Sequence, residues 1–272
     1  MHYVTAGSGP LVVLLHGFPE MWWSWRYQIA SLAAAGFCVV APDLRGYGET
    51  ESTGPFDIDT LRDDVVALLD HLGARRAHLV AHDWGAVIAW HLAATRPERC
   101  DKLVTLNGPH PVLFARALRR SPRQCLRSAY ILFFRLPWLP EAVLTRKNGY
   151  GVLRILRRFA VDHTHFGDDE LRPFAEAVCK AGRASAMLGW YRHLRLGGRE
   201  PGMAPRVDRP VLVVWGIGDT ALGFDDLVPG TEAFASSLEV RRIVGAGHFV
   251  HEEKPEIVDS ILVDFLTRRA SG

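Results

Sequence analysis

The chain has 272 residues, of which 48% are hydrophobic and 23% are charged, and its formal net charge is only +2. This composition is that of a soluble globular protein with a large buried core, and it excludes a disordered or fibrous chain. No uncharged apolar run is long enough to span a membrane, so we expect no transmembrane segment. The first residues do not resemble a secretory signal, so we expect a cytoplasmic protein.

The charge is distributed unevenly along the chain. Residues 109–205 hold 17 of the 32 basic residues but only 7 of the 30 acidic ones. A basic segment can face anionic lipid or an acidic partner, but here the arginines are scattered at helical spacing. This favours a solvated or internally paired surface, and no nucleic-acid partner is expected.

The cysteines give no sign of a cross-linked framework. They are widely spaced and form no C-x-x-C pair, at Cys38, Cys100, Cys125 and Cys179. We therefore expect reduced thiols, with neither a disulfide framework nor a metal site.

Short apolar runs alternate with helical patterns through the first part of the chain. This alternation is typical of a mostly parallel, twisted sheet with helices on both faces. The predicted strands are 11–15, 37–41, 77–81 and 103–106, and the predicted helices are 24–35, 58–72 and 84–94. Because the chain begins almost directly on a strand, we expect a short leading edge of the sheet.

The alternation stops at Asn107-Gly108-Pro109-His110-Pro111 and returns only at Pro210. A helical, arginine-rich insertion is predicted between these points. After it we expect strands at 211–215 and 240–244 and helices at 225–235 and 255–268. The sequence therefore predicts an α/β fold with a core of residues 1–108 and 206–272, and a helical cap inserted at residues 109–205.

Asp83 lies where a predicted strand turns directly into a helix, in Ala81-His82-Asp83-Trp84-Gly85. Small residues two positions before and after it allow the tight turn that exposes a nucleophile. The alternative is that Asp83 merely caps the following helix. That alternative is disfavoured because two further catalytic residue types follow at matching places.

These further residues are Asp219, at the end of Trp215-Gly216-Ile217-Gly218-Asp219, and His248, in a glycine-rich loop. The chain order nucleophile, acid, histidine is that of the α/β-hydrolase fold. A carboxylate at Asp219 holds the imidazole in one tautomer and stabilises its cation. Asp225 and Asp226 are nearby alternatives to Asp219, although they are typical of a helix start.

An aspartate in the nucleophile position restricts the substrate. Aspartate is ionised at neutral pH and needs no base to activate it, so His248 is free for another step. Attack on an acyl carbon would give a mixed anhydride, whereas attack on a saturated carbon with a leaving group gives an ester that water cleaves. The predicted substrate is therefore an epoxide or an alkyl halide, and a serine-type esterase is excluded at this turn. No metal or organic cofactor is expected.

The segment His16-Gly17-Phe18-Pro19 follows a predicted buried strand. We expect the backbone N–H groups of Phe18 and Trp84 to form an oxyanion hole, with an ordinary Gly-Pro turn as the alternative. Aromatic side chains are expected to line an apolar pocket for a small uncharged substrate, with core packing as the alternative for most of them. They are Phe18, Trp22, Trp84, Phe133 and Phe134.

Taken together, these motifs resemble the α/β-hydrolase-fold epoxide hydrolases. The resemblance covers nearly the whole chain and is carried by HGFPE at 16–20, DLRGYG at 43–48, HDWG at 82–85 and NGPHP at 107–111. It implies that Asp83 forms an alkyl ester and that His248, oriented by Asp219, activates the water that releases a vicinal diol.

The family also places two cap tyrosines over the nucleophile, where their phenols polarise and protonate the epoxide oxygen. In this chain the resemblance implies Tyr130 and Tyr191, with Tyr150 as the competing candidate. Residues 43–48 are expected to shape a loop beside the site without a catalytic role. Ala81 and Ala86 stand where the family usually has glycine, and Arg135 replaces a common glutamine, which leaves the pocket's shape open.

The nearest alternative is a haloalkane dehalogenase, which uses the same nucleophile. Such sites commonly carry a halide-binding asparagine where this chain has Phe18. A non-catalytic ligand-binding protein on the same fold is less favoured, because Asp83, Asp219 and His248 are all present. The sequence leaves a homodimer open.

Overall fold

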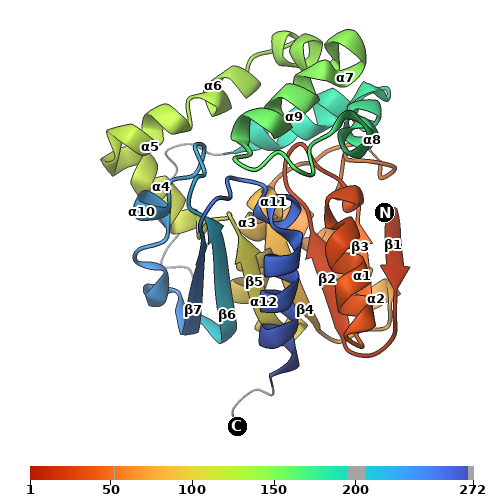
Figure 1. Cartoon of the computed structure of the whole chain (residues 1–272), viewed down its shortest axis with the longest axis vertical. Coiled ribbons are helices and arrows are strands. Elements are labelled where there is room, and N and C mark those ends of the chain that lie inside the picture. The colour runs from red at the N-terminus through yellow and green to blue at the C-terminus, as the bar shows by residue number, and fades with distance from the viewer. Residues whose placement is uncertain (52, 195–205, 269–272) are drawn as a thin grey trace.

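The computed structural model describes residues 1–51, 53–194 and 206–268 (Figure 1). Within these residues one sheet has the strand order β1-β3-β2-β4-β5-β6-β7. Neighbouring strands are parallel except β1 and β3, which are antiparallel. The strands are β1 (Tyr3–Ala6), β2 (Leu11–Leu15), β3 (Cys38–Pro42), β4 (Ala77–His82), β5 (Cys100–Leu106), β6 (Val207–Gly216) and β7 (Ala235–Ile243).

Both faces of the sheet are covered by helices, which explains why the central strands are almost uniformly apolar. In β2, alternate residues enter opposite cores: Val13 and Leu15 join one, and Val12 and Leu14 the other. The first core includes residues from α2 (Ile58–His71) and α3 (Asp83–Thr95), and the second from α1 (Arg26–Ala34) and α12 (Pro255–Thr267).

Between β5 and β6 the chain leaves the sheet and forms helices α4 to α9, which we call the cap. Figure 1 shows these helices together over one end of the sheet. They are α4 (Pro111–Arg120), α5 (Pro122–Arg127), α6 (Tyr130–Phe134), α7 (Leu139–Phe159), α8 (Asp168–Cys179) and α9 (Arg183–His193). Among the described residues, no helix is both long enough and apolar enough to cross a bilayer.

The sheet and its main helices confirm the predicted order of elements, and several bounds agree within two residues. The predicted helix at 225–235 is wrong. The chain forms only α10 (Phe224–Leu227) and a 3-10 turn at Thr231–Ala233, and β7 already begins at Ala235. Pro229 and Gly230, the latter at φ 99°, interrupt helical geometry between these pieces.

Candidate active site

Asp83 occupies a sharp turn between β4 and α3. Its φ of 47° lies in the left-handed region, which residues other than glycine rarely adopt. Glycines let neighbouring segments approach: a Cβ on Gly17 would lie 2.4 Å from the Asp83 Cβ, and one on Gly108 would lie 2.2 Å from the Ala86 Cβ. Ala81 and Ala86 are fully buried, so the turn accommodates both methyl groups.

The two carboxylate oxygens of Asp83 face different groups. Oδ1 accepts a hydrogen bond from the Phe18 backbone N–H at 3.0 Å, and Oδ2 lies 3.7 Å from His248 Nε2. Trp84 follows in the first turn of α3, where backbone N–H groups have no carbonyl partner within the helix. The turn therefore places one oxygen beside backbone donors and directs the other toward the histidine.

His248 is nearly buried in the loop after β7 and is oriented by Asp219. Its Nδ1 donates to Asp219 Oδ2 at 2.8 Å, and the other Asp219 oxygen accepts the N–H groups of Ala221 and Leu222. Burial lowers the pKa of His248, but the charge and hydrogen bond of Asp219, together with the Asp83 charge, raise it to about 9. The alternatives Asp225 and Asp226 instead begin α10.

Asn107 is a further supporting residue whose role the sequence did not reveal. It is buried at the end of β5, with φ 39°. Its Nδ2 donates to Asp219 Oδ2 at 2.8 Å, and its Oδ1 accepts the Gly216 N–H at 2.9 Å. Asn107 therefore holds the Asp219 carboxylate from the end of the neighbouring strand β5, and Gly216 of β6 fixes the Asn107 amide. In the sequence, the indication of this role was that Asn107 directly follows a buried strand.

A buried polar cluster of Glu20, His82 and His251 lies behind the His248 loop. Glu20 Oε2 accepts the Gly17 N–H at 2.7 Å and bonds to His82 Nδ1 at 2.8 Å, while His82 Nε2 bonds to the His248 carbonyl oxygen at 2.9 Å. Both ring nitrogens of His82 are therefore engaged, one by Glu20 and one by the His248 carbonyl oxygen.

This cluster also brings candidate metal-ligating atoms within 4.8 Å of one another. A metal would need a free nitrogen on His82, and both nitrogens are already engaged by Glu20 and the His248 carbonyl oxygen. Burial raises the pKa of Glu20, but the His82 and His251 rings outweigh it and hold the pKa well below its ordinary value. The cluster is therefore an internal hydrogen-bond network that links the Gly17 loop to the His248 loop.

Tyr130 of α6 and Tyr191 of α9 reach the same pocket as Asp83 and His248. Their ring centroids are 6.2 Å apart. Burial and the nearby Asp83 charge raise the pKa of both phenols well above the ordinary value, and Tyr130 adds to the effect on Tyr191. Both hydroxyls therefore keep their protons and are available as donors. The competing Tyr150 is 48% exposed and is not among the residues of this pocket.

The pocket is narrow and mainly aromatic. Its cavity of about 20 Å³ has room for roughly one water molecule, so a larger substrate requires aromatic side chains to move. The residues that line it are Phe18, Asp83, Tyr130, Phe134, Ile155, Phe159, Tyr191, Ala221, His248 and Phe249.

Only Phe18 and Phe134 of the predicted apolar lining reach this pocket. Trp22 instead packs against the core that contains α1 and α12. Trp84 packs edge-on against Tyr191 at 5.4 Å, and Phe133 packs against Phe134 at 5.8 Å. In α6 the pocket is lined by Tyr130 and Phe134, which are one helical turn apart, whereas Phe133 is not among the lining residues.

The loop at residues 43–48 has structural contacts. Asp43 accepts the Trp22 N–H at 3.0 Å, and Arg45 Nε donates to Asp64 at 2.6 Å. A Cβ on Gly48 would lie 2.2 Å from the Asp43 carboxylate, so glycine is required for the close approach. None of these residues lines the Asp83 pocket.

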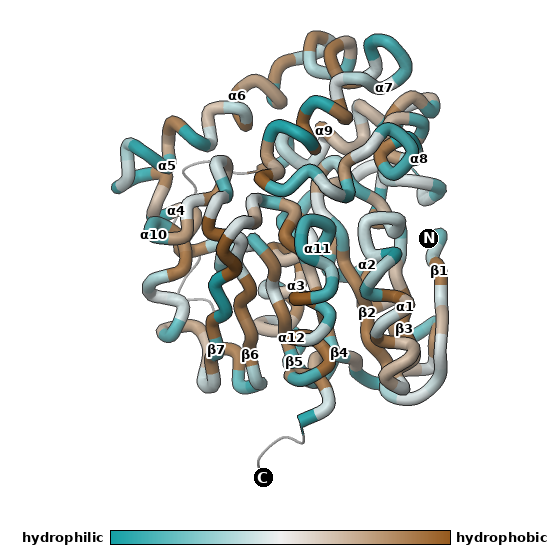
Figure 2. Tube along the Cα trace, in the orientation of Figure 1, coloured by the Kyte–Doolittle hydropathy of each residue, from teal (hydrophilic) through white to brown (hydrophobic). Residues whose placement is uncertain are grey.

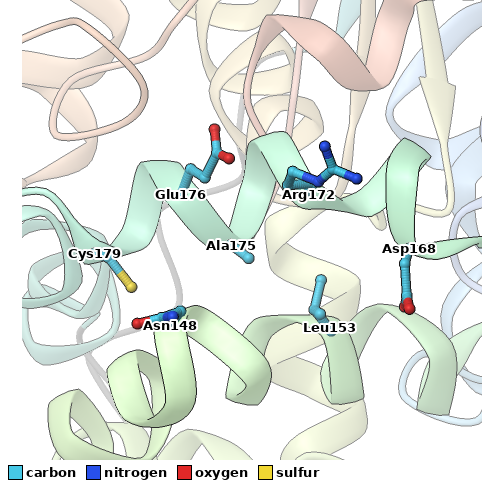
Figure 3. Close-up of a pocket in the computed structure, with 7 residues that line it drawn as sticks. All are labelled: Asn148, Leu153, Asp168, Arg172, Ala175, Glu176 and Cys179. Carbon is cyan, nitrogen blue, oxygen red and sulfur yellow. The ribbon is translucent and has the colours of Figure 1, made fainter.

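A larger hollow of about 540 Å³ lies elsewhere, between α7 and α8 (Figure 3). It contains no member of the Asp83, Asp219 and His248 group, and burial raises the pKa of its one thiol, Cys179, away from reactivity. The smaller pocket is therefore the candidate active site. The residues of the hollow are Asn148, Leu153, Asp168, Arg172, Ala175, Glu176 and Cys179.

Several known proteins are similar to this chain over nearly its whole length. The α/β hydrolase fold family matches residues 10–129. The AB hydrolase superfamily protein YfhM of Bacillus subtilis is 38% identical and aligns over 98% of this chain and 94% of its own. Epoxide hydrolase 4 of Homo sapiens is 34% identical over 97% of this chain and 75% of its own. The crystal structure of a Bacillus megaterium epoxide hydrolase with an inhibitor superposes with a TM-score of 0.91, at 31% identity over 98% and 96% of the two chains.

Proposed function

The chain belongs to the epoxide hydrolases of the α/β-hydrolase fold, and we propose that it converts a small apolar epoxide into a vicinal diol through a covalent ester on Asp83. One observation carries the mechanism: Asp83 Oδ1 accepts the Phe18 N–H while Oδ2 faces His248 in a pocket that two protonated phenols also line. This arrangement supplies a nucleophile, a base and acids at one place.

In the first step, an Asp83 oxygen attacks a carbon of the epoxide. A carbon–oxygen ester bond forms as the carbon–oxygen bond of the ring breaks. The departing oxygen is an alkoxide, a poor leaving group, so it takes a proton from Tyr130 or Tyr191 as it develops charge. The product of this step is a hydroxyalkyl ester of Asp83 and a tyrosinate.

In the second step, His248 removes a proton from water, and the hydroxide attacks the carbonyl carbon of the ester. The Phe18 and Trp84 N–H groups stabilise the oxyanion that forms. Collapse of this intermediate breaks the acyl–oxygen bond, and the second diol oxygen receives the proton from His248. The tyrosinate recovers its proton from the His248 cation before the water is activated, and the new carboxyl proton afterwards passes to His248, so the enzyme is restored and one water is consumed.

The raised pKa of His248 supports this division into two steps. Its imidazole is cationic at neutral pH in the free enzyme, because the value is about 9. Attack by Asp83 needs no base, so this state does not prevent the first step. Ester formation removes the Asp83 charge, which is one of the causes of the raised pKa. The histidine therefore becomes easier to deprotonate at the stage where a base is required.

We further propose that residues 1–108 and 206–272 act as the hydrolytic core and residues 109–205 as a cap that supplies the acids. Asp83, Asp219 and His248 follow strands β4, β6 and β7, whereas Tyr130 and Tyr191 belong to α6 and α9. Residues 195–205 and 269–272 lie outside the described part of the chain.

Product analysis with two substrates tests this proposal against the haloalkane dehalogenase alternative. Purified protein is given styrene oxide or, separately, 1-bromobutane, and diol and free bromide are measured. We expect diol without bromide. The two phenols of the pocket are able to protonate an epoxide oxygen, whereas a departing halide needs no proton donor. Bromide release would favour the dehalogenase, and full diol formation by Asp83→Ala would contradict the role of Asp83.

A further inference from the structure

An exposed apolar edge runs along the cap. Six of the twelve large hydrophobic side chains that are exposed in the described residues lie between positions 126 and 143. Trp138 is 83% exposed and Leu132 is 64% exposed. We call this set the cap edge: Leu126, Leu132, Leu136, Trp138, Leu139 and Val143.

The cap edge lies at the periphery of the molecule. Figure 1 shows the chain from α5 through α6 to the start of α7 along the upper border of the cap, on the opposite side from the C-terminus. In Figure 2 hydrophobic colour is visible along this part of the chain. Trp138 connects α6 and α7 with φ 57°, a left-handed conformation that a tryptophan rarely adopts, and its indole remains uncovered by the fold.

The elements around this edge carry almost only positive charge. Residues 111–160 contain 11 Arg or Lys side chains and a single acidic one, Glu141. That carboxylate is paired with Arg192 at 2.8 Å. Exposed basic side chains lie on both sides of the edge in sequence, at Arg116, Arg120 and Arg123 before it, and at Arg146, Lys147, Arg154 and Arg158 after it.

We propose that the cap edge docks on the surface of an anionic lipid bilayer. Exposed tryptophan and leucine side chains insert into the boundary between headgroups and acyl chains, while arginines and lysines contact anionic headgroups. The contact is peripheral, with the cap lying on the membrane surface.

A second copy of this chain fits the edge less well. A two-fold contact through the same surface would bring two strongly basic segments together. A nucleic acid would match the positive charge, but its phosphates offer no apolar contact for Trp138 and Leu132. A lipid surface satisfies both the apolar and the charged parts.

The docking has a consequence for access to the active site, which rests on the proposed function. α6 carries Leu132 on its exposed side and Tyr130 and Phe134 on the side that lines the Asp83 pocket. Apolar epoxides partition into membranes, so docking would place the aromatic lid of the pocket beside the phase that holds the substrate.

Vesicle sedimentation tests the proposal without any catalytic readout. The full chain is sedimented with vesicles of phosphatidylcholine alone or with about one third phosphatidylglycerol, at about 0.1 M salt. We expect binding to the anionic vesicles only, and its loss at about 1 M salt. Trp138→Ser and the pair Arg116→Glu/Arg123→Glu should each weaken partitioning by about tenfold or more.

Matched substitutions on the core serve as controls. Ile257→Ser removes an apolar side chain that is 48% exposed, and Arg75→Glu/Arg96→Glu reverses two exposed charges. These variants should bind vesicles as the parent does. Styrene oxide turnover by Trp138→Ser in vesicle-free buffer should equal that of the parent, which separates a failure of docking from a failure of the proposed activity.

Three results would overturn the proposal. The first is no binding to anionic vesicles, or equal loss with the core controls. The second is a dimer, detected by sedimentation equilibrium, that does not bind vesicles and that dissociates in the Trp138→Ser variant. That result would show that the cap edge contacts a second copy of the chain. The third is binding to duplex DNA in place of vesicles.

Discussion

The strand ends and the cap hold their parts of the active site in different ways. At the strand ends, directional hydrogen bonds fix each group: Phe18 holds Asp83, and Asn107 and two backbone N–H groups hold Asp219 against His248. In the cap, Tyr191 is packed between aromatic rings, with Phe18 at 5.1 Å and Phe134 at 5.0 Å. In the proposed mechanism, the groups that form and cleave the ester are thus held rigidly, whereas the donors to the epoxide oxygen lie in packing that is able to adjust to the substrate.

Removal of the nucleophile should give the largest effect, because nothing else at the strand ends replaces it. Asp83→Ala should lower diol formation by about 10⁴-fold or more. The rate is measured with styrene oxide, with thermal unfolding as the check on folding. Alanine also has a Cβ and therefore keeps the strained φ of 47°, so the substitution gives no relief of backbone strain and the unfolding temperature is the check that the variant is folded. A variant that keeps more than a tenth of the activity would exclude Asp83 as nucleophile.

Substitution of the base should separate the two steps. With His248→Gln we expect turnover to fall by about 10³-fold or more while ester formation continues, because Asp83 is already ionised. Mass spectrometry of the quenched protein should therefore show one substrate mass added to Asp83. An unmodified protein after long incubation with substrate would show that His248 is needed before the ester forms.

Loss of one phenol in the cap should reduce activity less than loss of Asp83 or His248 at the strand ends. Tyr130→Phe and Tyr191→Phe should each reduce the rate of ester formation by about 10²-fold, and the double variant should reduce it much further. Tyr150→Phe is the matched control, because this side chain is exposed outside the pocket, and it should have no effect. If Tyr150→Phe slowed ester formation as much as Tyr130→Phe and Tyr191→Phe, the loss of rate would not be specific to the phenols of the pocket.

The pH dependence should differ between the two steps. The pKa of His248 is raised to about 9 in the free enzyme, so lowering the pH protonates the base, and loss of the Asp83 charge in the ester moves that pKa below 9. Ester hydrolysis should rise up to tenfold per pH unit until the pKa of the ester form is passed. Ester formation should stay level between about pH 6 and 9, because its acids are phenols with raised pKa values. Rapid-quench rates check this, and hydrolysis that falls with rising pH would contradict the assigned base.

The smallest effect is expected at Asn107, which contacts Asp219 and does not line the pocket. Asn107→Ala removes one hydrogen bond to Asp219 and one to Gly216, so His248 is less well oriented. We expect ester hydrolysis to slow by about tenfold, with ester formation unchanged. Single-turnover kinetics distinguish the steps, and an equal loss in both would indicate general destabilisation instead of positioning.

The same contrast explains what the sequence was able to predict. Strand ends follow from local patterns, so Asp83, Asp219 and His248 could each be placed after a buried strand before any contact was known. The pocket lining depends on which side of a cap helix faces inward. The predicted lining therefore lacks Phe159 and Ile155, which line the pocket, and includes Trp22, Trp84 and Phe133, which do not.

Contacts between distant segments also could not be predicted from the sequence. Glu20 and His82 are 62 positions apart, and His82 and the His248 carbonyl are 166 apart, so no local pattern indicates their hydrogen bonds. The incorrect helix at 225–235 has a local cause, because Pro229 and Gly230 lie inside an otherwise helical pattern and interrupt it. The order of strands and helices was predicted correctly because the hydrophobic runs of the sequence define it.

Isotope transfer in a single turnover tests the covalent ester most directly. Enzyme in excess over styrene oxide reacts in H₂¹⁸O, and the diol and the peptide that contains Asp83 are analysed by mass spectrometry. The ester mechanism predicts ¹⁸O in the Asp83 carboxylate and none above background in the diol, because water attacks the ester carbonyl. Label in the diol with an unlabelled Asp83 would mean that water attacks the epoxide itself, and would contradict the central role given to Asp83.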